Sequence, residues 1–495
     1  MQEVDDEKAK LLKDTNDDSQ AMEGATLGLS RITQIIESEE KLGLKIKPGK
    51  NDHPEAKPLS DKAKKELRAI LADLHPADIA YVLEALPQDD RLAVWYLVEP
   101  EDEGDILLEV NDGVRETLIE SMNREELVDA VENLDTDEMA DLFEDLPPDV
   151  VAEVQEGLTH EERAQLRAAM SYPEDSVGAR MDFEMITVRS DITLEVVLNY
   201  LRKFDSLPDH TDQIYVVDNQ AKFLGALTMS QIVLHEPFVN INDLLDTEVL
   251  TLNPLDSVSD AAQAFERYDL VSAPVVDEAG RLVGRLTVSE VVDVIREEGE
   301  GDAFAAVGLD EDQDIFGNVW EAAKSRWIWL GVNLCTAFFA SRVISAFDGT
   351  IERVVALAAL MPIVAGIAGN SGNQTLTLLV RSLAMGQVTD SNQNDLIRKE
   401  IFVSVINGLL WGAMAGLFVW LLYWDSANGL MLGVVMFLAM FLNIVVGAVV
   451  GIGVPLALRW CGRDPAMGGS VLLTFITDSG GFLIFLGLAS FFFMR

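Results

Sequence analysis

Asp478 is the residue of this chain whose type and position most strongly indicate chemistry. It lies inside a long apolar stretch, and two hydroxyl residues, Thr474 and Thr477, precede it closely. An ionised carboxylate at the centre of a membrane costs several kcal/mol, so it must face water, a partner or a cation. Oxygen ligands without sulfur or imidazole favour Mg²⁺, Mn²⁺ or Ca²⁺, and Mg²⁺ suits a small ligand set because it keeps most of its water. We therefore predict a cation site at Asp478; a protonated, inactive aspartate is the alternative.

A second polar feature lies in residues 361–375, where Pro362, several glycines and the amides Asn370 and Asn373 interrupt an apolar run. Such residues loosen a membrane helix, and irregular backbone at that depth is tolerated where it lines a water-filled cavity or packs against protein. Tight helix packing would explain the glycines but not the amides. We expect Asn370 and Asn373, with Thr474 and Thr477, to line the cation site.

Five apolar stretches must position these residues, and each has the ~20 residues that cross ~30 Å of hydrocarbon. An odd number of spans puts the two ends of the chain on opposite sides, and buried helices of a soluble protein are the alternative. Basic residues concentrate before the first stretch and in two of the loops, which places the N-terminal part inside the cell and the C-terminus outside. The expected spans are 327–347, 354–384, 401–423, 430–458 and 468–493.

The charge of the chain lies almost entirely in its other half. The 495 residues carry 83 Asp and Glu against 37 Lys and Arg, a net charge of −46, although 49% of the residues are hydrophobic. Residues 318–495 hold ten basic and nine acidic residues, so residues 1–317 carry −47. That surface excludes nucleic acid as the main partner, since phosphate binding needs positive charge. It exceeds what the sites proposed below require, and the surplus has no explanation in the sequence.

The acidic half contains two kinds of repeat after a polar extension and lead-in helix at 1–58. Apolar residues recur every 12 positions from Leu74 to Leu158, often followed by proline, which predicts stacked short helices in a superhelical domain over 59–172. Residues 215–233 then reappear 59 positions later as a strand, turn, strand and helix. This second repeat resembles a tandem pair of CBS domains, expected at 173–238 and 239–299.

CBS pairs often bind adenosine nucleotides through a Thr or Ser followed three residues later by Asp. Thr228 and Thr287 match the first position, but Gln231 and Glu290 stand where that motif has Asp. ATP is therefore a candidate ligand with an incomplete motif. A dense acidic run follows the second CBS unit, and we expect a connecting acidic helix at 300–326 whose like charges divalent cations would relieve.

The order of these parts resembles the MgtE-type magnesium channel and transporter family over residues 59–495. The most specific segments are 362–366, 369–375, 381–384, 464–466 and the pair Thr477 and Asp478. The resemblance implies a multidomain protein with an all-α superhelical N domain, α/β tandem CBS domains and an all-α polytopic membrane domain of five transmembrane helices (327–495). It also implies a homodimer in membrane lipid, with a pore on the two-fold axis where Asp478 holds hydrated Mg²⁺.

The resemblance further implies regulatory Mg²⁺ sites between the helical domain, the CBS pair and the connecting helix. The matching residues are Asp105, Asp137, Asp141, Asp269, Glu290, Asp293, Glu298 and Asp302. Glu352 and Asp464, at opposite membrane faces, are weaker candidates for metal binding. Gly301 stands where the family can have an acidic residue, which weakens or removes one bridging ion.

These features predict a Mg²⁺ influx channel or transporter of the cell (inner) membrane that cytosolic Mg²⁺ closes. At low Mg²⁺ the facing carboxylates repel and the pore opens; at high Mg²⁺ the domains compact and the pore closes. One alternative is transport of another divalent cation such as Co²⁺ or Mn²⁺. The other is a CBS-regulated membrane receptor or enzyme, which is disfavoured because Asp478 lacks a catalytic partner at its depth. We expect a protein that is not an enzyme.

Overall fold

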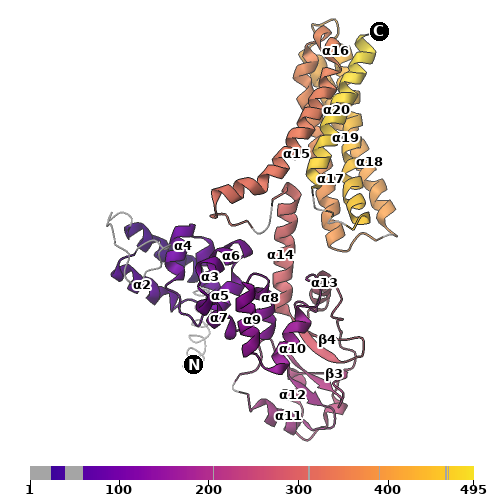
Figure 1. The fold of residues 1–495 in the computed structure, drawn as a ribbon. Helices are drawn as coiled ribbons and strands as arrows, with labels where there is room; N and C mark the ends of the chain where they lie inside the picture. The colour runs from indigo at the N-terminus through magenta and orange to yellow at the C-terminus, as the bar shows by residue number, and fades with distance from the viewer. Residues whose placement is uncertain are drawn as a thin grey trace, which may run out of the picture. The chain divides into compact units, whose positions relative to one another are not determined.

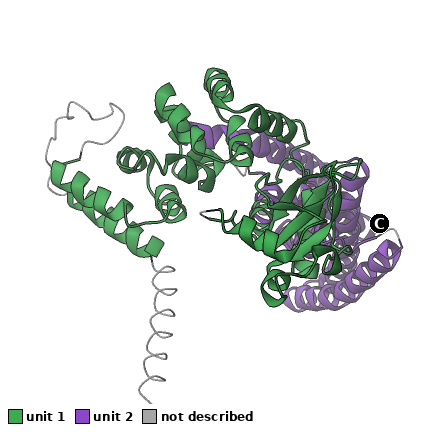
Figure 2. Cartoon of the chain, turned by 90° about the horizontal axis from the view of Figure 1, so that it is seen from below, with its two compact units in different colours: residues 1–297, 312–318 green, residues 298–311, 319–495 purple. Residues whose placement is uncertain are grey.

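The structure is a computed structural model that describes residues 24–39, 59–204, 206–309, 313–389, 391–462, 465 and 468–494. Two compact units are present, which Figure 2 colours separately: unit 1 contains residues 1–297 and 312–318, and unit 2 contains 298–311 and 319–495. Each unit has its own hydrophobic core. Most of the expected extension at 1–58 lies outside the described residues, and residues 24–39 within it form a helix.

Unit 1 begins with the expected series of short helices (Figure 1). The prediction of a helical repeat domain is confirmed, because most helices begin 12 residues after the one before. Proline at the first turn and side-chain capping by Asn123 and Thr159 account for several of these starts. The helices are α2 (Asp61–Leu71), α3 (Pro76–Glu84), α4 (Gln88–Trp95), α5 (Glu103–Glu109), α6 (Asp112–Ser121), α7 (Arg124–Glu132), α8 (Thr136–Phe143), α9 (Pro148–Gly157) and α10 (His160–Ala169).

Three arginines at equivalent positions tie consecutive helices of this domain together. Arg91, Arg115 and Arg163 each donate from Nε, over 2.8 Å, to the carbonyl oxygen eight residues earlier, at the end of the preceding helix. Carbonyls at a helix C-terminus lack partners within the helix, and a guanidinium there also complements the helix dipole. The repeat therefore has a polar component, arginine capping, in addition to its apolar seam.

The CBS part of unit 1 contains two β-β-α units, as the 59-residue repeat predicts. In the first, β1 is parallel to β2 and β2 is antiparallel to β3; in the second, β4 and β5 form an antiparallel pair. Each hairpin has a register shift at the same place, after Val216 and after Val275. The elements are β1 (Thr187–Arg189), α11 (Leu194–Leu201), β2 (Gln213–Val217), β3 (Phe223–Thr228), α12 (Met229–Leu234), a 3₁₀ turn (Ile241–Asp243), α13 (Val258–Tyr268), β4 (Ser272–Val276) and β5 (Leu282–Thr287).

The connecting helix differs from the one expected at 300–326. Helix α14 (Val288–Val307) starts directly after β5, so the helix of the second CBS unit and the connecting helix are one continuous element. The next helix, α15, begins at Val319 and includes the end of the expected segment. Residues 313–318 lead into α15. Residues 310–312, which precede this stretch, lie outside the described residues.

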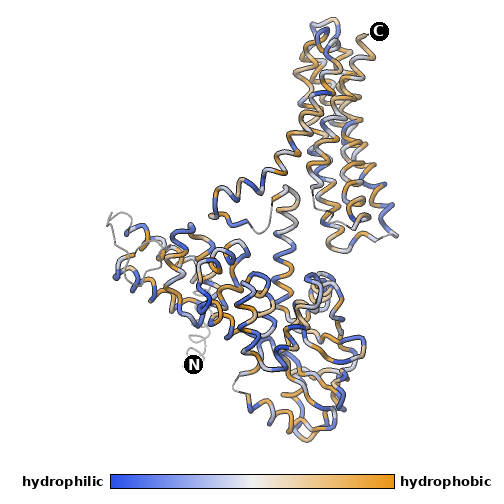
Figure 3. The backbone as a smooth tube through the Cα atoms, in the orientation of Figure 1, coloured by the Kyte–Doolittle hydropathy of each residue, from blue (hydrophilic) through white to orange (hydrophobic). Residues whose placement is uncertain are grey.

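Unit 2 is a bundle of long helices whose residues are largely hydrophobic (Figure 3). Among the described residues, four helices are long and apolar enough to cross a membrane, namely α15, α18, α19 and α20. The fifth expected span forms α17, a helix of 29 residues. The polar residues of α17 lower its hydropathy, so it is not one of these four helices. The elements are α15 (Val319–Ser345), α16 (Asp348–Arg353), α17 (Ala356–Ala384), α18 (Gln393–Leu422), α19 (Gly429–Trp460) and α20 (Gly469–Phe493).

Helix α19 lies at the centre of this bundle and is brought close to its neighbours by glycine. A methyl group on Gly447 would lie 2.7 Å from the carbonyl oxygen of Ala368 on α17, and one on Gly433 would lie 2.7 Å from the carbonyl oxygen of Gly416 on α18. Small residues at such contacts let helix backbones approach and gain van der Waals contact, which is the main attraction between helices in lipid.

This packing makes two glycines of the same helix respond differently to substitution. Gly447→Ala should lower the thermal unfolding midpoint of the detergent-purified protein, because overpacking against a backbone oxygen costs about 1–3 kcal/mol. Gly453→Ala is the matched control: nothing lies within 4 Å of the added methyl, and alanine favours the helix by about 1 kcal/mol. Equal midpoints for the two variants would contradict the close contact between α17 and α19.

Candidate functional site

Five carboxylates of unit 1 form one group, which we call the acidic cluster: Asp137 and Asp141 on α8, Asp182 before β1, and Glu290 and Asp293 on α14. Their charges act on one another, since the pKa of Glu290 responds to Asp141, Asp293 and Asp182, and that of Asp137 responds to Asp182 and Glu290. The cluster joins the helical domain to the first turns of α14. Four of the five were sequence-predicted sites; Asp182 was not.

Glu290 illustrates the electrostatic strain of this cluster. Burial is the first cause that raises its pKa, and repulsion by Asp141 is the second; together with the remaining carboxylates they bring it to about 8. Arg180 opposes these effects but does not cancel them. A carboxyl group in this position holds its proton at neutral pH unless another cation replaces that proton.

Asp137, on helix α8, is a second carboxyl group of the cluster whose pKa is raised. Its Oδ1 is buried and has no hydrogen-bond partner in the part of the chain that the structure describes. Burial, followed by repulsion from Asp182, raises its pKa to about 8, while its own backbone amide gives only partial relief. A buried oxygen without a donor is costly, so this site favours a proton or a metal ion.

Arg180 is the cation that the cluster shares. Its Nη2 lies 3.0 Å from Glu297 Oε2, and its Nη1 lies 3.9 Å from Asp141 Oδ2. Burial still outweighs this pairing and raises the pKa of Asp141 to about 6. Asp182 has its own partner, the buried Arg285, with Nη2 2.7 Å from Asp182 Oδ2. Arg296 also pairs with the cluster, since its Nη2 lies 3.7 Å from Asp293 Oδ1. Three arginines therefore compensate only part of the negative charge.

Asp105 interacts electrostatically with Glu109, which in turn interacts with Asp293 of the cluster. Sequence reasoning missed Glu109. Burial, followed by Asp102, raises the pKa of Asp105, and burial followed by Asp293 raises that of Glu109. Asp105 also acts on Glu109, one turn later on α5. Their spacing of four residues was a signal for this pair. Arg180 and Asp182, in contrast, lie in an irregular segment without periodicity.

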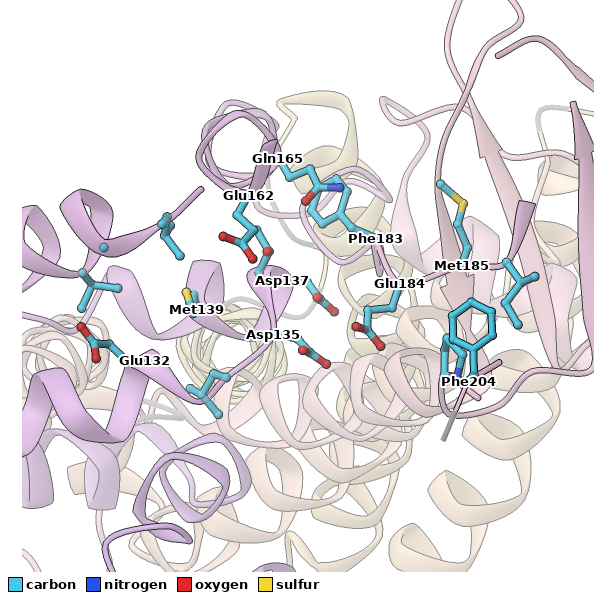
Figure 4. Close-up of a pocket in the computed structure, with 17 residues that line it drawn as sticks. Glu132, Asp135, Asp137, Met139, Glu162, Gln165, Phe183, Glu184, Met185 and Phe204 are labelled. Atoms are coloured by element: carbon cyan, nitrogen blue, oxygen red, sulfur yellow. The ribbon is translucent and has the colours of Figure 1, made fainter. Parts of the chain in front are cut away.

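A cavity of about 580 Å³ opens beside the cluster within unit 1. Figure 4 shows the carboxylates of Asp135, Asp137 and Glu184 pointing into the same space. Phe183 and Phe204 supply part of its apolar wall. The lining contains no lysine, arginine or histidine among the described residues, so its electrostatic potential attracts cations.

The donor chemistry of the cluster fits a hydrated divalent cation better than a fully coordinated one. All its side-chain ligands are carboxylate oxygens, the type that Mg²⁺ prefers. However, no three Asp, Glu, His or Cys side chains in the described part of the chain are close enough to hold one metal ion. Within the described residues, the cluster therefore offers carboxylate oxygens but no group of three that is close enough to coordinate one ion.

Three other residues were sequence-predicted regulatory sites: Asp269, Glu298 and Asp302. Asp269 is exposed at the C-terminal end of α13, in a left-handed backbone conformation. Glu298 is exposed on α14, one turn beyond Asp293. The backbone of Asp302 belongs to α14, but its side chain lies outside the described residues.

The two nucleotide candidates have structural roles. Thr228 is the N-cap of α12: its Oγ1 accepts from the backbone N–H of Gln231, whose side chain in turn accepts from the N–H of Thr228 over 2.8 Å. This reciprocal capping box uses both residues that the nucleotide motif would need. Thr287 is buried at the end of β5. Thr228 thus has a capping role, and Thr287 is a buried strand residue.

In unit 2, Asp478 lies on α20 and is partly accessible, beside the fully buried Thr477. Thr477 Oγ1 donates over 2.9 Å to the carbonyl of Leu473, and Thr474 Oγ1 donates over 2.8 Å to that of Ser470. Both hydroxyl groups therefore make their hydrogen bonds within α20. Of the two, Thr474 is the exposed one.

Asn370 and Asn373 lie on one side of α17, which we call the amide face: Gly366, Asn370, Asn373 and Thr377. These residues are spaced by three or four positions and all are exposed in the single chain. The opposite side of α17 packs into the bundle core. Gly369 meets α20, since a methyl group there would lie 3.6 Å from Thr477 Oγ1. Asn370 and Asp478 thus directly follow the two residues of this contact.

The weaker metal candidates receive little support from the structure. Glu352 is exposed on the short helix α16. Asp464 lies outside the described residues.

Three family models match this chain. The model described as a divalent cation transporter matches residues 361–488, the MgtE intracellular N domain matches 74–175, and the CBS domain matches 241–297. The first of these regions contains both the amide face and Asp478. The second contains Asp105, Asp137 and Asp141, and the third contains Glu290 and Asp293.

Similar proteins include three named Magnesium transporter MgtE. That of Enterococcus faecalis is 30% identical over 88% of this chain and 95% of its own length, and that of Bacillus subtilis is 27% identical over 87% and 95%. That of Thermus thermophilus is 30% identical over 66% and 71%. A solved structure of the cytosolic domain of the Mg²⁺ channel MgtE in complex with ATP is 27% identical, with 48% of this chain and 95% of that one covered and a TM-score of 0.43.

The raised pKa values predict that unit 1 loses stability as the pH rises. Between the ordinary values of 3.8 and 4.5 and the folded values of about 8, the folded state binds protons that the unfolded state has released. The free energy of unfolding therefore falls over that range, by an amount on the order of 2–4 kcal/mol. The measurement is the urea midpoint of the full-length protein in detergent at pH 5, 6.5 and 8, without divalent cations.

Glu290→Gln should make this pH dependence shallower, because it removes one titrating group. Glu120→Gln, at an exposed position on α6, is the matched control and should leave the dependence unchanged. A midpoint that rises with pH would contradict the assignment.

Proposed function

The chain belongs to the MgtE family of magnesium transporters, and from that premise we propose how it moves Mg²⁺ and how it is closed. The ion passes through a pore beside Asp478, and the acidic cluster senses Mg²⁺ in the cytosol. Family membership makes the chain a transporter rather than a CBS-regulated enzyme. The observation that carries the pore proposal is the amide face, a polar strip exposed on a helix of an apolar bundle.

A polar helix face cannot stay against lipid, because hydrocarbon offers no partner for amide groups. Asn370 and Asn373 must therefore meet water or protein in the assembled transporter. A second copy of the chain satisfies this requirement if the amide faces of the two α17 helices line a shared, water-filled path. This supports a homodimer in membrane lipid with α17 as a fifth transmembrane helix.

Asp478 adds the charge that this path needs. The contact between Gly369 and Thr477 places α17 against α20 directly before Asn370 and Asp478. Two symmetry-related Asp478 carboxylates at one pore would supply two negative charges to a hydrated Mg²⁺ with little direct dehydration. An inside-negative potential then drives influx with about 4.6 kcal/mol per 100 mV for a divalent ion, twice the value for one charge.

Orientation follows from the basic residues at the ends of the helices. Arg398 and Lys399 begin α18 and Arg459 ends α19, whereas the loop between α18 and α19 has no lysine or arginine. With the residues before α15 in the cytosol and five spans after them, the positive-inside rule favours a C-terminus outside the cell.

Closure is proposed to result from charge relief in the acidic cluster. Without divalent cations, the contact of α8 with α14 needs protons on Asp137 and Glu290, and repulsion between carboxylates that have lost their protons favours separation of the two helices. Mg²⁺ entering the cluster removes that repulsion and holds the helical domain against α14. Thr228 and Thr287 are left out of this scheme, because their capping and burial provide no role for a nucleotide.

A buried ion pair supports a mechanical link between the helical domain and the membrane helices. Arg91, which is fully buried on α4, lies with Nη1 2.6 Å from Asp314 Oδ2 and with Nη2 3.1 Å from Asp314 Oδ1. Asp314 belongs to the segment that leads into α15. Because one partner alone would leave a buried charge unpaired, this pair opposes separation of the segment from the helical domain.

Replacing Asp478 tests the pore. Asp478→Asn should reduce Mg²⁺ uptake into proteoliposomes to background, because the neutral amide cannot attract the cation, while the protein still inserts. Asp425→Asn, in the exposed loop between α18 and α19, is the matched control and should transport normally. Uptake by Asp478→Asn at the control rate would exclude Asp478 as the ion site, and competition with Co²⁺ and Mn²⁺ in the same assay measures selectivity.

Protease protection tests the sensor. Mg²⁺ should slow cleavage of unit 1 in the full-length protein by about tenfold or more. The double variant Asp137→Asn with Glu290→Gln should be protected even without Mg²⁺, because the substitutions remove the same repulsion that the ion removes. Glu116→Gln with Glu120→Gln, two exposed sites on α6, is the matched control and should still need Mg²⁺.

If the Asp137 and Glu290 double variant is cleaved rapidly at every Mg²⁺ concentration, closure depends on direct coordination and the charge-relief mechanism is wrong. If Mg²⁺ fails to protect the unsubstituted protein, the sensor proposal itself is wrong.

A further inference from the structure

Asn443 is a fully buried amide in the middle of α19, the central helix of unit 2. Its surroundings are the apolar core of the bundle, and Met440 and Ile444 beside it belong to that core. A buried amide is costly unless its donors and acceptor are paired. Nothing in the apolar pattern of 430–458 indicated a function for this residue.

The amide nitrogen of Asn443 connects three helices. Nδ2 donates over 3.2 Å to the carbonyl oxygen of Val364 on α17 and over 3.2 Å to the carbonyl oxygen of Thr477 on α20. Oδ1 of the same side chain is buried and has no partner among the described residues. The amide therefore acts as a donor to both neighbours and as an acceptor to neither.

Gly481 makes room for this connection. A methyl group on Gly481 would lie 2.3 Å from Nδ2 of Asn443, a separation that two nonbonded atoms cannot have. The preceding residue, Gly480, has nothing within 4 Å of the corresponding point. Of the two adjacent glycines, Gly481 is the one that the amide requires.

Stability alone does not account for Asn443. Val364 and Thr477 lie inside helices, where each carbonyl also accepts the N–H four residues later, so neither oxygen depends on Asn443 for a partner. The unpaired Oδ1 meanwhile carries a desolvation cost. An apolar side chain of the same size would fill the space without that cost. The benefit of the amide must therefore lie in the geometry that it imposes.

That geometry is the position of the ion site. Thr477 is bonded to Asp478 through the peptide group whose oxygen Asn443 contacts, and Val364 lies one turn before the part of α17 that carries Gly369 and Asn370. We infer that Asn443 is a positioning residue of the pore, which holds Asp478 on α20 in register with the amide face on α17. This inference rests on the proposed role of Asp478.

The central test is Asn443→Leu in the full-length protein, which keeps the size of the side chain and removes both donors. The half-saturating Mg²⁺ concentration for uptake should rise about tenfold, and the preference for Mg²⁺ over Co²⁺ should decrease, while the thermal unfolding midpoint does not fall. A tenfold change corresponds to about 1.4 kcal/mol, which is the scale of hydrogen bonds between membrane helices. Asn443→Ser, which keeps one donor, should be intermediate.

Ser404→Ala is the matched control. Ser404 is also buried on a bundle helix, but its Oγ donates over 2.7 Å to Ile401 of the same helix, so it connects no two helices. Its removal should change neither the half-saturating concentration nor the selectivity. Asp478→Asn in the same assay separates the two proposals.

If Asp478→Asn abolishes uptake while Asn443→Leu shows unchanged affinity and selectivity, the positioning role is wrong and the pore assignment stands. If Asp478→Asn transports normally, the proposed pore fails first. A fall in the maximal rate and unfolding midpoint of Asn443→Leu, with unchanged half-saturation and selectivity, would show a purely structural role, as would failure of both the Leu and Ser variants to fold.

Discussion

Burial of like charges is the constraint on which the arrangement of unit 1 depends. Helices α8 and α14 meet through carboxylates that repel one another, and Arg180 provides only partial compensation. In an ordinary protein core such a contact would be selected against, since an uncompensated buried charge costs several kcal/mol. Here it makes the contact conditional on protons or metal ions. The free energy that the contact lacks is what a divalent cation can supply.

Unit 2 handles polarity in the opposite way. Its helices pack through glycines and apolar side chains, and its polar groups are few and are separated by function. Threonine hydroxyls are satisfied within their own helix, Asn443 binds two neighbouring helices, and the amides of α17 face outward. Among the described residues, Asn443 Oδ1 and Ser479 Oγ are buried without a hydrogen-bond partner. A polar surface like that of the α17 amides requires a water-filled path or a second copy.

Two elements connect the units along the chain: helix α14 and the segment that leads into α15. Helix α14 runs without interruption from the CBS sheet through the acidic cluster, and the segment after it is held to α4 by the buried pair of Arg91 and Asp314. Arginine capping holds consecutive repeat helices together. We therefore expect the helical domain to move as one rigid body.

Periodicity and composition alone determined a large part of this protein: the 12-residue spacing of the helices, the two β-β-α units, the apolar helices and the isolated Asp478. Each of these is a local pattern that burial imposes on consecutive residues. The tertiary structure decided which acidic residues meet, bringing Asp182, Glu109 and Arg180 to the predicted carboxylates and leaving Asp269 exposed at the end of α13. It also showed that α14 starts at Val288 and that Asn443 joins α17 to α20. Contacts between distant segments produce no periodic pattern in the sequence. In a chain with so many acidic residues, the sequence does not distinguish those that the fold buries from those that stay exposed.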